Sequence, residues 1–335
     1  MKTELARLNR LAHRASVSPR EKYTSLYHHI YAEETLKCSL LELREDAAIG
    51  VDGVSVLEYK ADIDSNIKSL QERLVKQSYK PQPSRRRYIP KVGSRKKRPL
   101  GVPCTEDKLV QKSCKEVLEP IYEAKFCEYS YGYRPKRHCH DAIDELGRTI
   151  QQKRISYVVE ADIKGFFDNV NHDILIELLS YRIKDKRIIR LIRKMLRAGI
   201  MEYGLTRASV DGTPQGSILS PLLSNIYLHY CLDMWFKLLF KPSCFGEANF
   251  FRYADDYVAC FQYKSDAERY LKQMKERLER FNLEIEPSKT KLIEFGRFAE
   301  HNAKRRGDPK PGTFDFLGFT HYCSKTRYGG FKLPD

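Results

Sequence analysis

Three aspartates have the chemistry and the placement to bind a divalent cation. Asp162 ends an apolar run of the sequence, and Asp255 and Asp256 stand side by side between two further apolar runs. Three carboxylates gathered together would repel one another strongly unless cations lay between them. Mg²⁺ prefers oxygen ligands and commonly takes one or two carboxylates together with substrate phosphates. Two such ions about 4 Å apart can activate an attacking hydroxyl and stabilise a leaving phosphate, so the pattern is typical of metal-assisted phosphoryl transfer.

An adjacent pair of aspartates also has an ordinary structural explanation. Asp tolerates turn conformations, and such pairs are common at the tips of hairpins. Because side chains alternate along a strand, Asp255 and Asp256 cannot point in the same direction unless the turn redirects one of them. From the spacing alone, a metal site and a plain hairpin turn both stay open.

The elements that must position these aspartates can be predicted from the same segments. The β-branched and aromatic run 155–161 favours a buried strand that stops at Asp162. The short apolar runs 249–253 and 257–262, separated by 254–256, predict a hairpin. The acidic residues would therefore lie where strands end.

The rest of the chain predicts helices around these strands. The first 75 residues are typical of helices broken at a glycine-rich turn, 50–53, and the proline-rich, basic stretch 76–103 favours extended structure. Apolar spacing and composition predict helices over 105–124, 141–152, from Asn171 or His172 onward, 186–197, 217–240 and 265–281, and short strands over 283–285, 292–295 and 314–319. Mixed strands with helices between them indicate an α+β fold.

The net charge indicates a polyanionic partner. The 335 residues include 60 Lys and Arg against 44 Asp and Glu, which gives a formal charge of +16 and a pI near 9.3. Cationic side chains that neutralise phosphates release condensed counterions, so nucleic acid is the expected partner, and a basic protein without such a partner is the alternative. Nine cysteines without a CxxC pair argue against a disulfide framework and a structural zinc site. Without a signal peptide or an 18-residue apolar span, we expect no membrane partner and a cytoplasmic location of bacterial type.

Seven segments resemble, in order, the motifs of reverse transcriptases, and most closely those of the group II intron branch. They are RPLGVP (98–103), SYGYRP (130–135), ADIKGFFD (161–168), GTPQGS followed by ILSPLLSNI (212–226), YADD (253–256), PSKTK (287–291) and FLGF (316–319). The resemblance spans about residues 50 to 320. One such segment could arise by chance, whereas seven in the family's order could not.

The resemblance implies a right-hand polymerase made of fingers and palm, with an antiparallel palm sheet packed on helices. We expect residues 1–75 to form an N-terminal extension and the start of the fingers, 76–155 the fingers, and 156–335 the palm. Fingers helices would be interleaved around 171–215. The family continues into a helical thumb, which we expect to be absent from this chain, and an absent thumb could leave apolar surface for self-association.

The resemblance also assigns the catalytic and metal-binding residues. Asp162, Asp255 and Asp256 would be catalytic, and together with the backbone carbonyl of Ile163 they would hold the metal. Two Mg²⁺ ions are the expected cofactors, with Mn²⁺ as an alternative.

Five positions match residues that hold the incoming nucleotide in the family. Lys91 and Arg98 would bind the triphosphate, because developing phosphoryl charge needs cations. Phe167 matches the steric gate that crowds a ribose 2′-hydroxyl, although an aromatic side chain there could equally be core. Gln215 would line the sugar, and Lys289 would lie near the nucleotide or bind the template or primer backbone.

Four further positions are expected to contact template or primer. Arg134, Lys136 and Arg137 lie in a predicted turn, and Gly318 belongs to the segment that resembles the region beneath the primer terminus. The expected partners are an RNA template, with intron RNA as the native one, a DNA or RNA primer, and dNTPs.

The function that the resemblance implies is RNA-directed DNA polymerase of the group II intron type, adding dNTPs to a primer by a two-metal mechanism. One alternative is an RNA-binding maturase in which the polymerase site matters less. Another is a domesticated reverse transcriptase in antiviral defence, which would share every motif. The three aspartates, Phe167 and Gln215 favour the enzyme over the maturase, because a degenerate site would be expected of a pure RNA binder.

Overall fold

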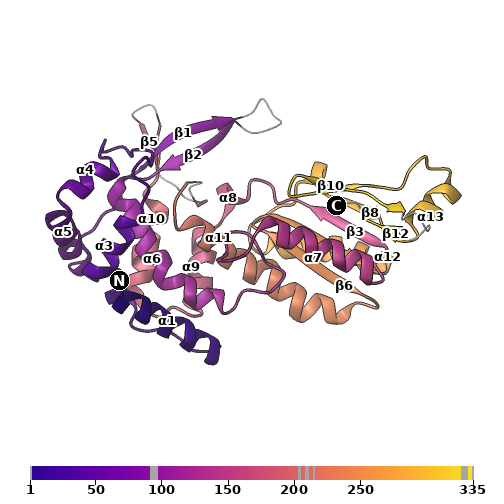
Figure 1. Ribbon diagram of the computed structural model, residues 1–335, viewed down its shortest axis with the longest axis horizontal. Coiled ribbons are helices and arrows are strands. Elements are labelled where there is room, and N and C mark those ends of the chain that lie inside the picture. The colour runs from indigo at the N-terminus through magenta and orange to yellow at the C-terminus, as the bar shows by residue number, and fades with distance from the viewer. Residues whose placement is uncertain are drawn as a thin grey trace. The chain divides into compact units, whose positions relative to one another are not determined.

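The computed structural model describes residues 2–90, 97–202, 205–207, 211–213, 216–325 and 331–333. Its contacts divide the chain into two compact units, Met1–Phe126 with Phe167–Ile226 and Cys127–Phe166 with Tyr227–Asp335. Figure 1 labels the elements of both units. None of the helices among the described residues is long and apolar enough to cross a membrane.

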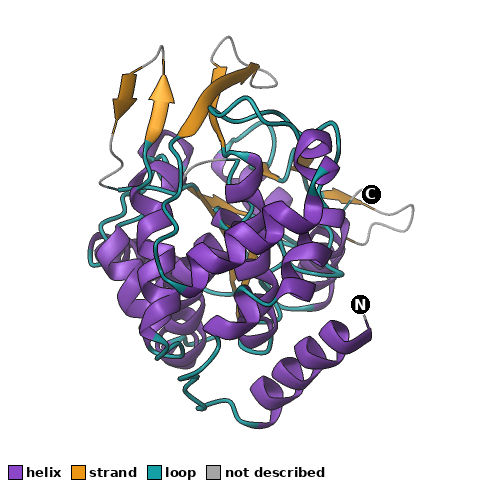
Figure 2. Ribbon diagram, turned by 90° about the vertical axis from the view of Figure 1, so that its left-hand side faces the viewer, coloured by secondary structure: helices purple, strands orange, loops and turns teal. Residues whose placement is uncertain are grey.

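The first unit is mostly helical (Figure 2). Its helices are α1 (Lys2–Val17), α2 (Tyr27–Ile30), α3 (Glu33–Leu41), α4 (Val56–Ala61), α5 (Ile63–Val75), α6 (Thr105–Glu123), α9 (His172–Ser180) and α10 (Lys186–Arg197). The short helix α8 (Phe166–Asn169) and the helix α11 (Ser220–Leu228) each run from one unit into the other. Helix α9 begins where the sequence predicts, because the Asn171 side chain accepts hydrogen bonds from the N–H groups of Asp173 and Ile174.

The strands of the first unit are β1 (Ser84–Pro90), β2 (Lys97–Val102), β4 (Ile200–Glu202) and β5 (Leu205–Arg207), in the order β2-β1-β4-β5. Strands β1 and β2 pair antiparallel, from Arg85 opposite Val102 to Pro90 opposite Lys97. The basic, proline-containing stretch predicted to be extended is therefore a two-stranded ribbon. Most of its side chains are exposed or half-buried, and β4 pairs with β1 in parallel.

The second unit is built on an antiparallel sheet. Its strands β3 (Tyr157–Ala161), β6 (Ala248–Tyr253), β7 (Asp256–Phe261) and β8 (Lys291–Glu294) lie in the order β6-β7-β3-β8. The other elements are α7 (Cys139–Gln152), the π-helical segments η1 (His229–Asp233) and η2 (Phe236–Phe240), the 3₁₀ segments η3 (Lys241–Ser243) and η4 (Pro287–Lys289), α12 (Lys264–Glu279), α13 (Ala299–Arg306), β9 (Phe314–Phe316), β10 (Phe319–His321), β11 (Ser324–Lys325) and β12 (Phe331–Lys332).

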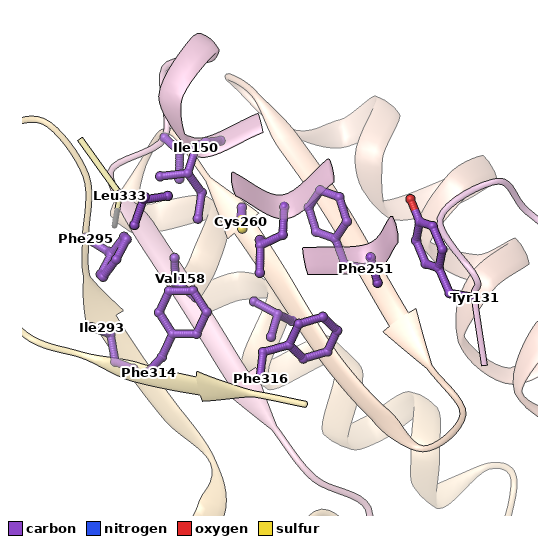
Figure 3. Close-up of a cluster of buried hydrophobic side chains, with 14 residues drawn as sticks. Tyr131, Ile150, Val158, Phe251, Cys260, Ile293, Phe295, Phe314, Phe316 and Leu333 are labelled. Atoms are coloured by element: carbon purple, nitrogen blue, oxygen red, sulfur yellow. The ribbon is translucent and has the colours of Figure 1, made fainter. Parts of the chain in front are cut away.

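Both faces of this sheet are covered. On one face, Val158, Phe251 and Val258 pack against residues of α7 and against Phe314 and Phe316 of β9 (Figure 3). On the other face, aromatic side chains of β6, β7, η2 and α12 form one cluster, which contains Phe236, Phe240, Phe250, Tyr257, Phe261 and Tyr270. Burial on both faces explains why β6 and β7 read as nearly continuous apolar runs.

Three predictions of local structure were wrong in detail. The long helix predicted over 217–240 begins at Ser220 and contains two π-helical segments, which apolar spacing cannot reveal. The strand predicted over 283–285 is a single bridge between Ile163 and Ile285. The strand predicted over 314–319 is a hairpin that turns at Leu317 and Gly318, and both of these residues have positive φ.

The first boundary between the two units falls after Phe126. Residues 127–155, which we expected in the fingers, belong to the second unit. The reason is a direct attachment to the sheet: Ser130 forms a bridge with Arg252 in β6, and α7 packs on the same strand. Residues 167–226, which include α9 and α10, belong to the first unit.

Candidate active site

Asp162 and Asp256 meet at one end of the antiparallel sheet. Ala161 of β3 lies opposite Tyr257 of β7, so the next residues along, Asp162 and Asp256, continue the same register. Side chains at opposed positions of two antiparallel strands lie on the same face of the sheet. Both aspartates line one pocket of about 80 Å³, together with Glu160, Ala161, Tyr257, Lys289, Asp315, Phe316 and Leu317.

Asp255 lies in the two-residue loop that joins β6 to β7. Tyr253 and Asp256 form the last pair of the hairpin, which leaves Ala254 and Asp255 as the loop. Ala254 has a φ of 56°, a conformation that usually requires glycine. Asp255 is half-buried and Asp256 is exposed. Because side chains alternate along a strand, Asp255 and Asp256 were not expected to point the same way unless the turn redirected one of them. In the structure Asp256 lines the pocket and Asp255 occupies the adjoining loop.

The backbone on both sides of Ile163 is hydrogen-bonded to the segment 284–286. Ile163 forms an antiparallel bridge with Ile285, in which the Lys164 N–H donates to the Glu284 carbonyl at 2.9 Å. On the other side of the bridge, the Glu286 N–H donates to the Asp162 carbonyl at 2.8 Å. In a pair of this type the N–H and C=O of the bridged residue itself point away from the partner segment. The Ile163 carbonyl therefore points away from the segment 284–286.

Lys289 forms an ion pair with Asp162, the predicted metal ligand. Its Nζ donates a hydrogen bond to Oδ2 of Asp162, and the two side chains are 57% and 19% exposed. The hydrogen bond to Asp162 raises the pKa of Lys289, and the charges of Asp162 and Asp256 act in the same direction. The Lys289 ammonium group is therefore a cation that Asp162 stabilises in the lining of the pocket.

The donor set fits a hard divalent cation in its chemistry. The pocket offers carboxylate oxygens from Asp162 and Asp256, and magnesium prefers oxygen ligands and often uses one or two carboxylates. Within the described parts of the chain, no group of three His, Cys, Asp or Glu side chains is arranged so that it could hold a metal ion. Two of the three predicted carboxylates, Asp162 and Asp256, thus line one pocket, and Asp255 lies in the loop directly before Asp256.

In the first unit, the residues before Gln215 are tied to the segment that contains Phe167. The Thr213 N–H donates to the Phe167 carbonyl at 2.7 Å, and the Gly212 N–H donates to the Val170 carbonyl at 2.8 Å. The Gly212 carbonyl lies 2.7 Å from Nε2 of the buried His172. Gly212 has a φ of 92°, and a Cβ atom there would approach the carbonyl oxygens of residues 167 and 168 to about 3 Å. The segment that contains Phe167 and the start of the GTPQGS motif therefore lie in contact.

The end of the same motif contacts the strand that carries Arg98. A Cβ atom on Gly216 would lie 2.5 Å from the carbonyl oxygen of Gly101 in β2, so the two backbones touch. Gln111 of α6 anchors the next residues, because its Oε1 accepts from Ser217 Oγ and from the Ile218 N–H, both at 3.0 Å. Arg98 is exposed on β2. Lys91 and Gln215, also predicted to bind the nucleotide, lie outside the described residues.

The four residues expected to contact template or primer differ in exposure. Arg134 is only 7% exposed, and its Nη1 donates to the carbonyls of Cys127 at 2.7 Å and Ser130 at 2.6 Å, so its guanidinium holds a turn together. Lys136 is exposed, and Arg137 is half-buried with its guanidinium 5.3 Å from the centre of the Tyr131 ring. Gly318 lies at the tip of the β9–β10 hairpin with open space around it.

Sequence reasoning missed the buried polar residues that support these segments. The most buried is Arg252 in β6, a strand of the β6–β7 hairpin that carries Asp255 and Asp256 (the acidic hairpin), and it forms an ion pair with Asp233 of η1. Gln111 and His172 have the corresponding role in the first unit. One signal was available for Arg252, because an arginine inside an otherwise apolar strand requires a buried partner. No signal in the sequence identifies which carboxylate that partner is.

Comparison with known proteins finds similarity to reverse transcriptases and to intron-encoded proteins. Residues 89–321 match the family described as reverse transcriptase (RNA-dependent DNA polymerase). The chain is 40% identical over 231 residues to the group II intron-encoded protein LtrA of Lactococcus lactis subsp. cremoris, which covers 68% of this chain and 38% of that protein. It is 40% identical over 183 residues to protein YkfC of Escherichia coli K12, covering 54% and 48%. A third relative, nuclear intron maturase 1 of Arabidopsis thaliana, is 31% identical over 97 residues, covering 28% and 13%.

The matched part of the chain spans well under half of the LtrA protein and about half of YkfC. The family match itself covers more than two thirds of this chain and includes the strand ending at Asp162 and the hairpin with Asp255 and Asp256. The protein therefore belongs to the reverse transcriptase (RNA-dependent DNA polymerase) family.

Proposed function

We propose that this protein is an RNA-directed DNA polymerase of the group II intron type, which extends a primer with dNTPs on an RNA template. The observation that carries the proposal is the convergence of Asp162 and Asp256 on one pocket, at the end of a sheet whose strands contain the family's acidic motifs. The relative named as a group II intron-encoded protein supports the group II intron assignment.

In this proposal the second unit is the palm and the first unit is the fingers. The antiparallel sheet β6-β7-β3-β8, covered by helices, supports the palm assignment. The basic ribbon β1–β2 and the helices that follow Asn171 support the fingers assignment. Residues 127–155 are then palm rather than fingers.

Asp162, Asp255 and Asp256, with the Ile163 carbonyl, would hold two Mg²⁺ ions, or Mn²⁺ in their place. Such ions, when bound, favour deprotonation of a hydroxyl and neutralise the charge that develops on phosphate oxygens. The chain's own contribution is to keep Asp162 and Asp256 in register on neighbouring strands. Lys289 would neutralise Asp162 before the metal binds and would then be available to a phosphate group.

The nucleotide would be held by residues of the first unit. Arg98 is an exposed cation on β2, and Phe167 is held by the bond from Thr213 to its carbonyl. Gln215, in the GTPQGS motif, would line the sugar of the nucleotide. Lys91 completes the predicted set, and the aromatic ring of Phe167 would exclude a ribose 2′-hydroxyl.

Template and primer are proposed to bind through cations and through the β9–β10 hairpin. The formal charge of +16 favours a polyanion, and just before α7 Lys136 is exposed and Arg137 is half-buried. Gly318, at the hairpin tip, leaves room for a backbone to approach. We do not assign Arg134 to the template, because its guanidinium is buried on carbonyl groups.

The direct test is extension of a DNA primer on an RNA template by the full chain with Mg²⁺ and dNTPs. We expect extension by the wild type, none by Asp255→Ala, and increased ribonucleotide incorporation by Phe167→Ala. Equal extension by the wild type and Asp255→Ala would contradict the catalytic assignment. Unchanged sugar discrimination in Phe167→Ala would remove only the steric-gate role.

A second function, assistance to intron splicing, is favoured by one finding. A relative of this chain is named as a nuclear intron maturase, and both functions can reside in one protein. A splicing assay with intron RNA separates them, because a maturase function should survive Asp255→Ala whereas polymerisation should not.

A further inference from the structure

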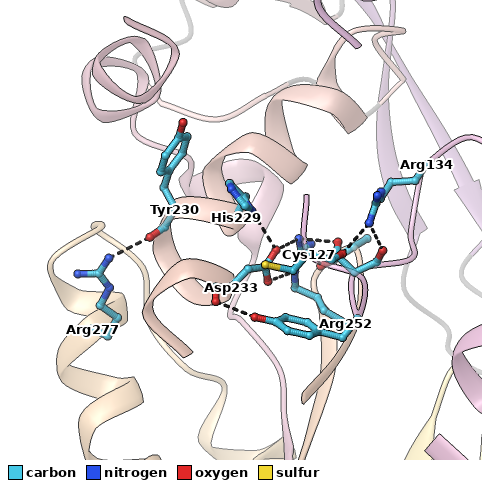
Figure 4. Close-up of polar contacts among 10 residues, drawn as sticks. Cys127, Arg134, His229, Tyr230, Asp233, Arg252 and Arg277 are labelled. Carbon is cyan, nitrogen blue, oxygen red and sulfur yellow. Dashed lines mark hydrogen bonds and ion pairs between the residues drawn. The ribbon is translucent and has the colours of Figure 1, made fainter. Parts of the chain in front are cut away.

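Arg252 of β6 and Asp233 of η1 form a fully buried ion pair (Figure 4). Both side chains are 0% exposed, and the pair has two hydrogen bonds, Nε to Oδ1 at 2.8 Å and Nη2 to Oδ2 at 2.6 Å. Burial raises the pKa of Asp233, but the interactions of its carboxylate with Arg252 and His229 together more than offset this and lower the pKa. The buried aspartate therefore stays ionised, and it keeps the guanidinium in one orientation.

The remaining donors of Arg252 reach the catalytic loop and a neighbouring segment. Its Nη1 donates to the Ala254 carbonyl at 2.9 Å, and its Nη2 also donates to Ser130 Oγ at 2.8 Å. The Ala254 carbonyl belongs to the peptide group that joins Ala254 to Asp255. Because guanidinium donors form a rigid planar fork, an arginine held by Asp233 and Ser130 fixes the plane of that peptide group.

The loop needs such support because its backbone is unfavourable for alanine. Ala254 has positive φ, which the surrounding structure must impose on a residue with a Cβ atom. The segment 129–132 contributes from the side: the Tyr131 N–H donates to the Arg252 carbonyl at 2.8 Å and the Arg252 N–H to the Tyr129 carbonyl at 2.9 Å. A Cβ atom on Gly132 would lie 2.3 Å from the Ala254 nitrogen, so only glycine allows this contact.

Arg134 acts one step further from the loop. Its bonds to the carbonyls of Cys127 and Ser130 close the turn that presents the Ser130 hydroxyl to Arg252 (Figure 4). The Tyr129 hydroxyl donates to the backbone carbonyl of Asp233 at 2.8 Å and joins the same turn to η1. Two buried arginines thus connect the π-helical segment, the SYGYRP motif and the acidic hairpin.

We propose that Arg252 is a positioning residue, which orients the Ala254–Asp255 peptide and with it the Asp255 carboxylate for the divalent cation. Asp233 and Ser130 hold Arg252 in place for this task. Neither Arg252 nor Asp233 is exposed, so neither touches nucleotide or nucleic acid. The inference rests on the proposed function, in which Asp255 is a metal ligand.

The alternative is that the ion pair only stabilises the fold, and a charge-free replacement separates the two roles. Arg252→Met combined with Asp233→Leu removes both buried charges together, an exchange that often leaves stability unchanged or improved. The double variant cannot donate to the Ala254 carbonyl. We therefore expect an unfolding midpoint near that of the wild type, but Mn²⁺ affinity and kcat each lower by roughly 10- to 100-fold. The KM for dNTPs should change much less, because Arg252 does not contact the nucleotide.

Mn²⁺ affinity can be measured without turnover, from the electron paramagnetic resonance signal of the free ion. Arg269→Met is the matched control, since Arg269 forms an ion pair with the buried Asp266 of the same unit, away from the hairpin. It should leave Mn²⁺ affinity unchanged. Ser130→Ala, which removes one partner of Arg252, should weaken Mn²⁺ binding in the same direction but less.

The proposal is overturned if the double variant folds and retains wild-type Mn²⁺ affinity and kcat. If the double variant does not fold, Arg252→Lys and Ser130→Ala decide, and wild-type Mn²⁺ affinity in both would overturn it. Failure of the proposed function looks different, because Asp255→Ala would then keep wild-type extension and Mn²⁺ affinity whatever happens at Arg252.

Discussion

Two carboxylate–cation pairs in the second unit differ in how far solvent reaches them. Asp233 and Arg252 are both 0% exposed and share two hydrogen bonds, whereas Asp162 is 19% and Lys289 57% exposed, and one hydrogen bond joins them. A buried pair cannot exchange its partner without leaving a charge unsolvated. An exposed pair can, because water or another cation can take the place of the lysine. The buried pair is thus suited to hold backbone, and the exposed pair to release a carboxylate to a metal ion.

The largest expected effect is loss of polymerisation on changing the exposed pair. Asp162→Asn removes the negative charge that would bind the metal, so primer extension should fall by about 1,000-fold or more. The free energy of unfolding should change by less than about 1 kcal/mol, because the pair is accessible to solvent. Primer-extension rates and urea unfolding of the same preparation measure both quantities. A large loss of stability would mean that Asp162 is part of the fold rather than an exchangeable ligand.

The buried pair should respond in the opposite way. Asp233→Asn leaves the Arg252 guanidinium charged and buried without an anion, which should lower the free energy of unfolding by about 3–5 kcal/mol. Asp266→Asn is the control: Asp266 is equally buried, but its partner Arg269 is 30% exposed and can be solvated, so the loss should be smaller. Equal losses in the two variants, measured by urea unfolding, would contradict the difference between the pairs.

The contribution of the buried pair to stability should depend on pH, because Asp233 has a shifted pKa. Burial raises the pKa of Asp233, but its interactions with Arg252 and His229 together lower this pKa below the ordinary aspartate value. A group whose pKa is lower in the folded state stabilises the fold above its unfolded pKa and loses that contribution as pH falls through the folded pKa. Wild-type stability should therefore fall steeply below about pH 4, and this part of the fall should be missing in Asp233→Asn. Parallel stability curves for the wild type and Asp233→Asn below pH 4 would contradict the assignment of this loss to Asp233.

The smallest effect on stability is expected at Lys289. Lys289→Met removes one exposed partner from Asp162, and the free energy of unfolding should change by less than about 1 kcal/mol. Urea unfolding in metal-free buffer measures this change. If Lys289→Met lowered the free energy of unfolding as much as Asp233→Asn, Lys289 would be needed for the stability of the fold, and the two pairs would not differ.

Much of the second unit could be predicted because its signals are local. The strand ending at Asp162, the hairpin around Asp255 and the helix 186–197 of the first unit each follow from apolar patterning and capping within a few residues. The order of the family's motifs then identified which aspartates to consider together. Register between β3 and β7, which aligns Asp162 with Asp256, needed the structure.

What could not be predicted depends on contacts between distant parts of the chain. Arg252 and Asp233 are 19 residues apart, and Ser130 is 122 residues from Arg252, so no periodicity links them. The π-helical segment η1 differs from the α-helix before it in its backbone hydrogen bonds, which apolar spacing does not reveal. Arg134 looked like a surface cation because arginine in a turn usually is one, and only the carbonyls it contacts show otherwise.

The most direct test of the exchangeable carboxylate is Mn²⁺ binding to the wild type, Asp162→Asn and Lys289→Met. Lys289 and the metal ion should compete for Asp162, so removing the lysine should strengthen Mn²⁺ binding, while Asp162→Asn should weaken it severely. Opposite shifts in the two variants are the predicted result. Unchanged Mn²⁺ affinity in Asp162→Asn would contradict the account, because Asp162 would then not be a ligand of the metal.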